Sequence, residues 1–306
     1  MNSAETYDIL CIGNYTKDTI ISPTGTTYVD GGAVNYAAHA SKRLGLKVAV
    51  VTRLAEEDQR VVDKFNQTGI DCFATYTPHS TCMKLEYPTL DPDIRSLSVT
   101  CTAGTITAGE ANRVKAKAAV IGTSLRGEID DDVIPSLKRQ GILLAADMQG
   151  FVRVLRGQKL IYEPWEEMPK TLAYLDILKS DAVEAEFLTG EKDIFRAAKT
   201  YAQLGPKEIV LTHKDGVLIY TENEYSELGF YPSKMNGRSG RGDTCIGAYV
   251  SMRLSLPPVE AGIWAAAVTS LKMENLGTFN RSKAEIEDLI HSRYGNITIH
   301  EQAAAN

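Results

Sequence analysis

Short apolar runs alternate along this chain with stretches of helical periodicity, and that alternation limits the fold more than any other feature. Strands that alternate with helices are typical of a parallel sheet covered by helices. We therefore expect an α/β protein with a mainly parallel central sheet and helices on both faces. The predicted buried strands are residues 9–12, 47–51, 118–121, 143–146, 177–179, 209–212 and 217–220.

The intervening segments have the spacing of helices. The first of them, residues 33–44, has apolar side chains on one face and stops at Gly45, as a helix followed by glycine does. At 306 residues the length allows two average domains, but we expect a single α/β unit over residues 1–306. The predicted helices are residues 33–44, 58–68, 131–140, 182–188, 193–204, 244–254, 259–273 and 283–291.

Two segments, residues 19–30 and 81–102, do not fit the alternation. Both are rich in Thr and carry turn signals, Pro23 and Gly25 in the first and Asp91-Pro92-Asp93 in the second. We predict short β-ribbons inserted into the α/β unit, where they can act as a lid over a site. A surface hairpin without a functional role is the other interpretation.

The charge balance narrows the classes of partner. Lys and Arg number 33 against 39 Asp and Glu, a formal charge of −6, which argues against a nucleic-acid binder. Any anion must then be held locally by backbone amides or a few cations. The five scattered cysteines, the polar N-terminus and the lack of a long apolar run predict a cytoplasmic protein that does not contact membranes.

Several common catalytic motifs are absent from the sequence. It contains no Gly-Lys pair, so it has no Walker A phosphate loop, and no G-x-G-x-x-G follows a strand. The metalloprotease motif and the His-Arg-Asp loop of protein kinases are missing as well. Residues 122–126 lack the second glycine of a nucleophile elbow.

The segment of residues 236–248 carries the most chemical information. Glycines 237, 240 and 242 precede a helical pattern, so several backbone amides can converge at a helix N-terminus and bind an anion. Asp243 then stands at the start of that helix, either as a helix cap or as the base that deprotonates an attacking hydroxyl. Arg238 and Arg241 can offset phosphate charge or simply cover the surface.

Polar residues that follow other strands suggest a ligand site at the sheet edge. Gly31 and Gly32 open the first long helix, and Asn35 one turn later can hydrogen-bond a polyhydroxy ligand. Acidic residues there, such as Asp18, can bind substrate hydroxyls or a hydrated Mg²⁺ ion. Each of these residues taken alone also fits an ordinary turn or loop.

Together these residues resemble the ribokinase-like carbohydrate kinases of the PfkB family, along essentially the whole chain. The early family signature matches Gly31, Gly32, Asn35, Ala37 and Ala38. The late signature matches Gly240, Gly242, Asp243 and Thr244. The chain departs from the late signature at Gly237 and Arg241, where the family usually has Asp and Ala. It also carries Asp181 in place of the Asn of the family's magnesium motif.

The resemblance implies a ribokinase-like α/β/α core with an inserted β lid, and it implies roles for individual residues. Asp243 would be the catalytic base, and the backbone amides of Gly240, Arg241, Gly242 and Asp243 would form the anion hole. Asp18, Gly31, Gly32 and Asn35 would bind the acceptor. Thr212, Gly216, Arg238 and Ser239 would contact the nucleotide, and Glu184 with Asp181 would hold Mg²⁺. The turn after the strand at 210–212 is one residue shorter than in the family, so the contacts to adenine are not placed.

The expected reaction is ATP-dependent phosphorylation of a small sugar or polyol, with Mg²⁺ as cofactor and any monovalent-cation requirement left open. Residues 146–153, 237–245 and 265–273 are similar to the bacterial myo-inositol kinases of the family, which favours myo-inositol. Nucleoside or ribose phosphorylation and a catalytically silent sugar or nucleotide sensor are the alternatives, and a dinucleotide-dependent oxidoreductase ranks below them. We expect a monomer or a homodimer formed through the lid, with no nucleic-acid partner.

Overall fold

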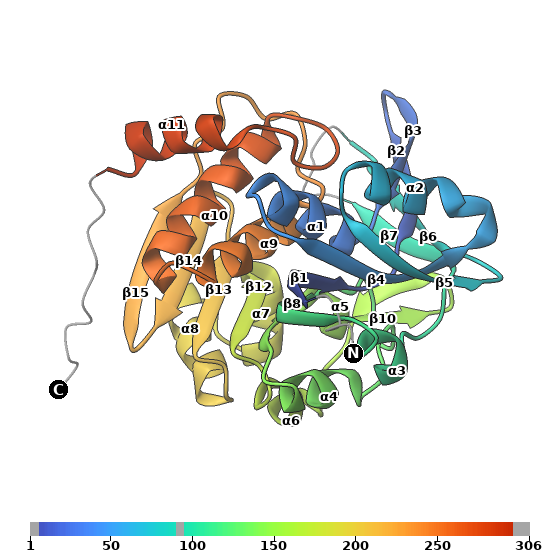
Figure 1. The fold of residues 1–306 in the computed structure, drawn as a ribbon, viewed down its shortest axis with the longest axis horizontal. Coiled ribbons are helices and arrows are strands. Elements are labelled where there is room, and N and C mark those ends of the chain that lie inside the picture. Colours follow the sequence, from blue (N-terminus) through green and yellow to red (C-terminus); the bar gives the residue numbers. More distant parts are fainter. Residues whose placement is uncertain (1–5, 90–94, 296–306) are drawn as a thin grey trace.

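The computed structural model describes residues 6–89 and 95–295, and its main body is a nine-stranded sheet (Figure 1). The strand order of this large sheet is β15-β14-β13-β12-β9-β8-β1-β4-β5. Pairing is parallel from β13 to β5 and antiparallel at the β13-β14-β15 end. The strands are β1 (Thr6–Ile12), β4 (Val48–Ala55), β5 (Asp71–Thr77), β8 (Lys115–Ile121), β9 (Leu143–Asp147), β12 (Ile177–Asp181), β13 (Glu208–Thr212), β14 (Gly216–Thr221) and β15 (Glu224–Gly229).

Helices cover both faces of the large sheet, which gives three layers (Figure 1). One layer contains α1 (Ala33–Arg43), α2 (Gln59–Gln67), α9 (Arg241–Arg253), α10 (Pro258–Met273) and α11 (Lys283–Arg293). The other contains α3 (Ala108–Ala111), α4 (Val133–Arg139), α6 (Met168–Leu172), α7 (Ala182–Thr189) and α8 (Ile194–Gln203).

Each central strand is apolar on both faces because each face meets a helical layer. In β1, Ile9 and Cys11 belong to the core under α1 and α9, whereas Leu10 and Ile12 belong to the core on the opposite face. This two-residue alternation explains why the buried strands read as continuous apolar runs. All seven predicted strands and all eight predicted helices are confirmed, so the predicted α/β class is correct.

Six further strands form a separate small sheet in the order β10-β11-β7-β6-β2-β3. The predicted segments 19–30 and 81–102 contribute four of them, although residues 90–94, including Asp91-Pro92-Asp93, lie outside the described residues. The other two were not predicted. The strands are β2 (Thr16–Ser22), β3 (Gly25–Gly31), β6 (Thr81–Glu86), β7 (Ser96–Cys101), β10 (Arg153–Arg156) and β11 (Lys159–Tyr162).

The small sheet has its own apolar core, formed by Met83, Leu85 and Val99 together with Leu125 from the large-sheet side. In β6 every second residue is buried, so Met83 and Leu85 point the same way. Asp18 of β2 is the register partner of Met83, which places a carboxylate beside this apolar face. The small sheet therefore offers both apolar and acidic groups to whatever lies beneath it.

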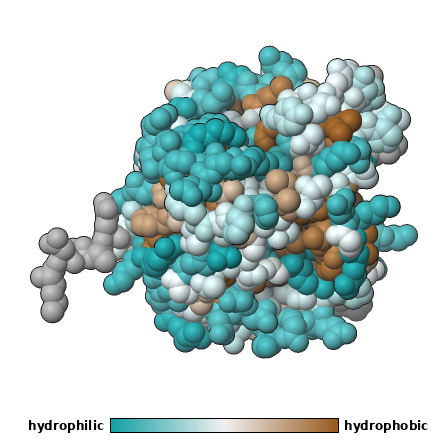
Figure 2. Space-filling view, turned by 90° about the vertical axis from the view of Figure 1, so that its right-hand side faces the viewer, coloured by the Kyte–Doolittle hydropathy of each residue, from teal (hydrophilic) through white to brown (hydrophobic). Residues whose placement is uncertain are grey.

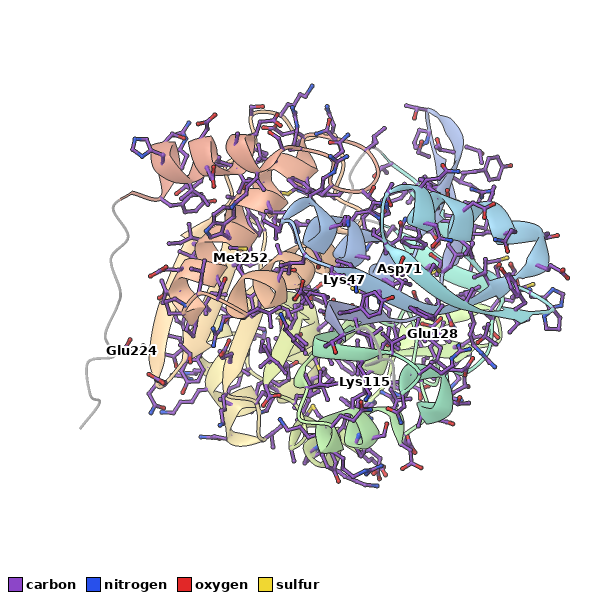
Figure 3. The ribbon with its side chains drawn as sticks, in the orientation of Figure 1. Lys47, Asp71, Lys115, Glu128, Glu224 and Met252 are labelled. Atoms are coloured by element: carbon purple, nitrogen blue, oxygen red, sulfur yellow. The ribbon has the colours of Figure 1, made fainter. Side chains whose placement is uncertain are left out.

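The surface is mainly hydrophilic on the side that carries the small sheet. Figure 2 shows this face with its apolar residues in separate patches among hydrophilic ones. Figure 3 shows side chains filling the spaces between the sheets and helices, with Glu224 at the edge strand β15 and Met252 on α9. Within residues 6–89 and 95–295, no helix combines the length and apolar character needed to cross a bilayer.

Candidate active site

A cavity of about 400 Å³ lies where the carboxyl ends of the large-sheet strands face the small sheet. It gathers predicted site residues that are far apart in the sequence. Those that line it are Asp18, Gly32, Asp181, Thr212, Arg238, Ser239, Gly240, Arg241, Gly242 and Asp243. Four other predicted site residues are not part of its lining, namely Gly31, Asn35, Glu184 and Gly216.

A close crossing of α1 and α9 brings the two glycine-rich segments together. Gly247 on α9 lies so near α1 that a Cβ atom there would be 2.6 Å from the Cα atom of Ala37. Real Cβ atoms do not approach backbone that closely, so only glycine permits this crossing. The N-termini of both helices consequently open onto the same cavity, one through Gly32 and the other through Gly240.

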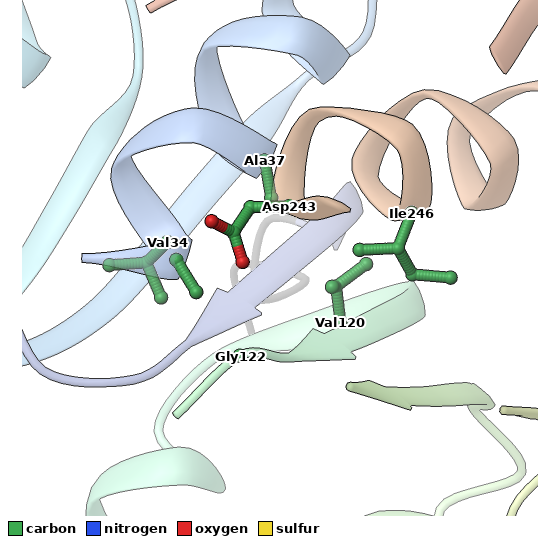
Figure 4. A pocket seen from close by; sticks show the side chains of 7 residues that line it. Val34, Ala37, Val120, Gly122, Asp243 and Ile246 are labelled. Carbon is green, nitrogen blue, oxygen red and sulfur yellow. The ribbon is translucent and has the colours of Figure 1, made fainter. Parts of the chain in front are cut away.

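Asp243 projects from the first turn of α9 toward α1 (Figure 4). Around it are apolar side chains from both helices and from β8, namely Val34, Ala37, Val120 and Ile246. Removal from water raises the pKa of Asp243 to about 6, and the nearby charge of Asp147 adds to the rise. The cations Lys179, Arg153 and Lys272 limit it. A carboxylate with a pKa just below neutrality is well suited to accept a proton.

Asp18 lines the same cavity as Asp243 and interacts with it electrostatically. Burial is the main cause that raises the pKa of Asp18 to about 7, and the charge of Asp243 raises it further. One oxygen of Asp18, Oδ1, is buried and has no hydrogen-bond partner among the described residues. A buried acceptor without a partner is costly, so this oxygen is suited to receive a hydrogen bond from a ligand hydroxyl.

The early glycines make room for Asp18 and for the chain that carries it. A Cβ atom on Gly31 would lie 2.1 Å from Oδ2 of Asp18. Gly32 has a φ of +93° and lies against the carbonyl of Asn14, a combination that favours glycine. The side-chain amide of Asn35 donates to the carbonyl of Asp30 at 2.9 Å, which ties the end of β3 to α1. Gly31 and Asn35 therefore do not line the cavity, but they position the residues that do.

The late glycine loop presents backbone amides to the cavity. Gly240 caps α9 with a φ of +74°, and its backbone rests on the ring of Tyr36, 2.2 Å from where a Cβ would be. The first backbone bond of α9 runs from the Thr244 amide to the Gly240 carbonyl at 2.9 Å. The amides of Gly242 and Asp243 precede it and carry the positive end of the helix dipole. This geometry suits an anion such as a phosphate.

Buried cations beneath the loop were missed by the sequence analysis. The ammonium nitrogen of Lys179, on β12, is 2.8 Å from Oδ2 of Asp147 and would be 2.4 Å from a Cβ on Gly242. Although burial opposes the charge, neighbouring carboxylates, chiefly Asp147, raise the pKa of Lys179. Arg153 also lines the cavity, 3.8 Å from Glu184. Asp147 and Arg153 belong to residues 146–153, the segment that is similar to myo-inositol kinases. That similarity was the sequence signal that could have identified them.

Asp181 and Glu184 form the capping box at the start of α7. Oδ1 of Asp181 accepts from the Glu184 amide at 2.8 Å, and Oε2 of Glu184 accepts from the Asp181 amide at 3.0 Å. Burial and the charge of Asp181 raise the pKa of Glu184 to about 8. Among the described residues, no three His, Cys, Asp or Glu side chains form a metal-binding group. Asp181 lines the cavity and Glu184 is buried behind it, so these two carboxylates would suit a hydrated Mg²⁺ ion that keeps most of its waters.

The turn between β13 and β14 also contributes to the cavity wall. Thr212 lines the cavity together with His213 and Lys214. Burial lowers the pKa of His213, although Glu227 opposes this effect. Gly216 lies in the hairpin itself, where a Cβ atom would be 2.4 Å from the carbonyl of Leu228. Its position therefore serves strand pairing.

The similarity of this chain to known proteins is extensive. The sequence profile of the pfkB family carbohydrate kinases matches residues 1–285. A sulfate complex of a pyrophosphate-dependent kinase in the ribokinase family is 34% identical, with a TM-score of 0.85 over 91% of this chain and 99% of that one. A second structure, of such a kinase with a pyrophosphate analog and myo-inositol, is 33% identical, with a TM-score of 0.84 over 92% and 99%.

A more distant neighbour shows that the fold itself is ribokinase-like. The ribokinase of Arabidopsis thaliana, complexed with ribose and ATP, has a TM-score of 0.74 at 17% identity, covering 94% of this chain and 99% of its own. A comparison with curated proteins found no match to this sequence.

Proposed function

Because this chain belongs to the pfkB family of carbohydrate kinases, we propose that it phosphorylates a hydroxyl of a small cyclic polyol, with myo-inositol as the favoured acceptor. The observation that carries this proposal is the pairing of Asp243 with the amides of the α9 N-terminus, opposite Asp18. It combines a proton acceptor, an anion site and an acceptor for ligand hydroxyls in one cavity. Its volume of about 400 Å³ accommodates a polyol beside a small donor.

In the proposed reaction the acceptor hydroxyl lies between Asp18 and Asp243. Asp243 takes its proton as the oxygen bonds to the transferred phosphorus, and the bond from that phosphorus to the donor's bridging oxygen breaks. The amides at the start of α9, with Lys179 and Arg153, stabilise the charge on the moving phosphoryl group. Glu184 and Asp181 would hold Mg²⁺, which when bound screens the negative charge of the donor phosphates.

Pyrophosphate is the donor that we favour over ATP. The cavity wall of residues 212–214 and 238–242 consists of polar, cationic and glycine residues. Such a wall provides charge for phosphate oxygens, whereas a purine ring prefers apolar and aromatic contacts. The similar kinases at 33–34% identity are themselves pyrophosphate-dependent. ATP, the donor implied by the family resemblance, is the alternative.

We also propose that the small sheet closes over the bound acceptor as a lid. Met83, Leu85 and Leu97 of the small sheet line the cavity opposite the α9 N-terminus. Apolar side chains there would exclude water from the phosphoryl group and limit wasteful hydrolysis of the donor.

An acceptor screen with two donors tests the proposal. Purified protein with Mg²⁺ is given pyrophosphate or ATP, and myo-inositol, other inositols, ribose, fructose or nucleosides are compared through ³¹P NMR of the products. We expect inositol phosphate to form, with pyrophosphate faster than ATP by at least an order of magnitude. A preference for ribose or nucleosides would overturn the acceptor proposal. Ligand binding without any product would indicate a silent sensor.

A further inference from the structure

Lys272 is a cation buried directly behind the glycine loop, and the proposed function leaves it without a role. It lies in the last turn of α10 and is 1% exposed. Its ammonium nitrogen donates to the carbonyl of Gly237 at 3.3 Å and to the carbonyl of Ser239. Burial lowers the pKa of Lys272 to about 8, which the charge of Asp243 partly offsets. Burying an ammonium group costs free energy, and groups with pKa values shifted in this way are concentrated at functional sites.

The loop is attached to the end of α10 at further points. The amides of Asn236 and Gly237 both donate to the carbonyl of Met273, at 2.9 Å and 3.0 Å. The side-chain amide of Asn236 donates to the carbonyl of Glu274 at 3.0 Å. Gly237 itself lies so close that a Cβ would be 2.6 Å from the carbonyl of Asn275. Residues 236 and 237 thus hold the start of the loop against the end of α10, whereas the carbonyl of Ser239 is held by Lys272.

The direction of these carbonyls determines the direction of the amides. In a trans peptide the C=O and N–H groups point in opposite directions. Because the carbonyls of residues 237 and 239 point back at Lys272, the amides of residues 238 and 240 point forward. Arg238 and Gly240 both line the cavity, so their amides face the side on which the donor phosphate would lie.

Tyr36 completes this arrangement from α1. The Lys272 ammonium is 5.5 Å from the centre of the Tyr36 ring, and the same ring supports the backbone of Gly240. The ammonium therefore lies against an aromatic ring and two carbonyl oxygens, which supply partners for a buried positive charge.

We propose that Lys272 is a positioning residue for the anion site: its ammonium sets the peptides of residues 237–240 so that their amides face the donor phosphate. The proposal rests on the phosphoryl-transfer function above. It predicts that Lys272 affects the donor and not the acceptor. A purely structural lysine would instead affect folding stability and leave the affinity for pyrophosphate unchanged.

The test compares Lys272→Met with Lys283→Met. Lys283 is exposed and also lies over an aromatic ring, 5.7 Å from the centre of Trp264, so the control removes a lysine charge beside an aromatic ring outside the cavity. Pyrophosphate binding is measured by titration calorimetry, steady-state kinetics are measured for both substrates, and the thermal midpoint is recorded. We expect K272M to weaken pyrophosphate binding at least tenfold and to lower kcat about 10²-fold, the loss typical of one oxyanion-site donor. The KM for myo-inositol should stay at the wild-type value. The thermal midpoint should stay at the wild-type value or rise.

Two results would overturn the assignment. One is wild-type pyrophosphate affinity and kcat in K272M. The other is a lower thermal midpoint with unchanged pyrophosphate affinity, which would make Lys272 structural. If the wild-type protein binds pyrophosphate but phosphorylates no acceptor, the proposed function fails while the calorimetric comparison still tests Lys272.

Discussion

The ammonium nitrogen of Lys179 lies 2.8 Å from Oδ2 of Asp147, and this buried ion pair sits beneath Gly242 in the first turn of α9. The pair joins two strands of the large sheet to the helical layer above them, since Asp147 ends β9, Lys179 lies in β12 and Gly242 is in the first turn of α9. Its charges reach the proposed base as well, because Asp147 raises the pKa of Asp243 and Lys179 lowers it. The stability of the core and the chemistry of the cavity are therefore coupled here.

Breaking this pair should destabilise the protein strongly. Lys179→Met leaves Asp147 buried and unpaired, and we expect the free energy of unfolding to fall by about 3–5 kcal/mol, as measured by urea denaturation. The double variant Asp147→Leu with Lys179→Met should regain most of that stability, yet it should stay inactive because both charges near the anion site are gone. Equal stability of the single and double variants would show that the unpaired Asp147 carboxylate is not the cause of the stability lost in Lys179→Met.

Asp243→Asn should abolish turnover while leaving the donor bound. Without the proton acceptor we expect kcat to fall by at least 10³-fold, whereas the Kd for pyrophosphate should stay within a factor of three. The pKa of Asp243 in the folded protein, about 6, lies above the ordinary 3.8, so the folded state loses stability as the pH rises from 3.8 to about 6 and does not regain it above that. The neutral Asn should therefore raise the free energy of unfolding at pH 7.5 by about 3 kcal/mol. Turnover near the wild-type rate would remove the base assignment.

The pH profile of kcat/KM provides an independent view of the same carboxylates. Activity should rise as the pH increases through about 6 to 7, because Asp243 and Asp18 must both lose their protons and influence each other. Asp147→Asn removes the largest charge that raises the pKa of Asp243, so the residual activity of that variant should rise at a lower pH. A profile that is flat between pH 5 and 8 would contradict the assignment.

Much of this structure could be predicted because the buried strands are apolar on both faces. Ile9 to Ile12 meets helices on either side, so its sequence carries no polar interruption. The edge strands β5 and β15 were missed because each has exposed positions that accept polar residues, such as Asp71 and Glu224 (Figure 3). The strands β10 and β11 were missed because they are only four residues long.

The residues of the candidate site also fall into those that the sequence could predict and those that it could not. Asp243, Gly240 and Gly242 could be predicted because one short segment carries both the glycines and the acid that they serve. Lys179 and Lys272 could not, since each lies inside an ordinary apolar strand or helix, and only tertiary packing brings its ammonium to the glycine loop. Sequence spacing does not reveal that kind of contact.

Gly242→Val should damage the anion site through Lys179. A Cβ atom at residue 242 would lie 2.4 Å from the Lys179 ammonium nitrogen, so the lysine must move or the helix start must shift. We expect both a higher Kd for pyrophosphate and a kcat/KM lower by at least 10²-fold. Gly109→Val is the matched control, because the nearest atom to a Cβ there is 3.8 Å away. Wild-type kinetics in G242V would show that this close contact is dispensable.

Glu184→Gln should separate metal binding from helix capping. A glutamine oxygen can still accept from the Asp181 amide, so α7 keeps its cap, but the charge offered to Mg²⁺ is lost. We expect the Mg²⁺ concentration for half-maximal rate to rise at least tenfold, and EDTA to abolish activity in both proteins. Because burial raises the pKa of Glu184 to about 8, the neutral variant should be at least as stable as the wild type at neutral pH. Glu285→Gln is the control, since Glu285 fills the same position in the Ser282 capping box of α11, and an equal Mg²⁺ shift there would exclude Glu184 from metal binding.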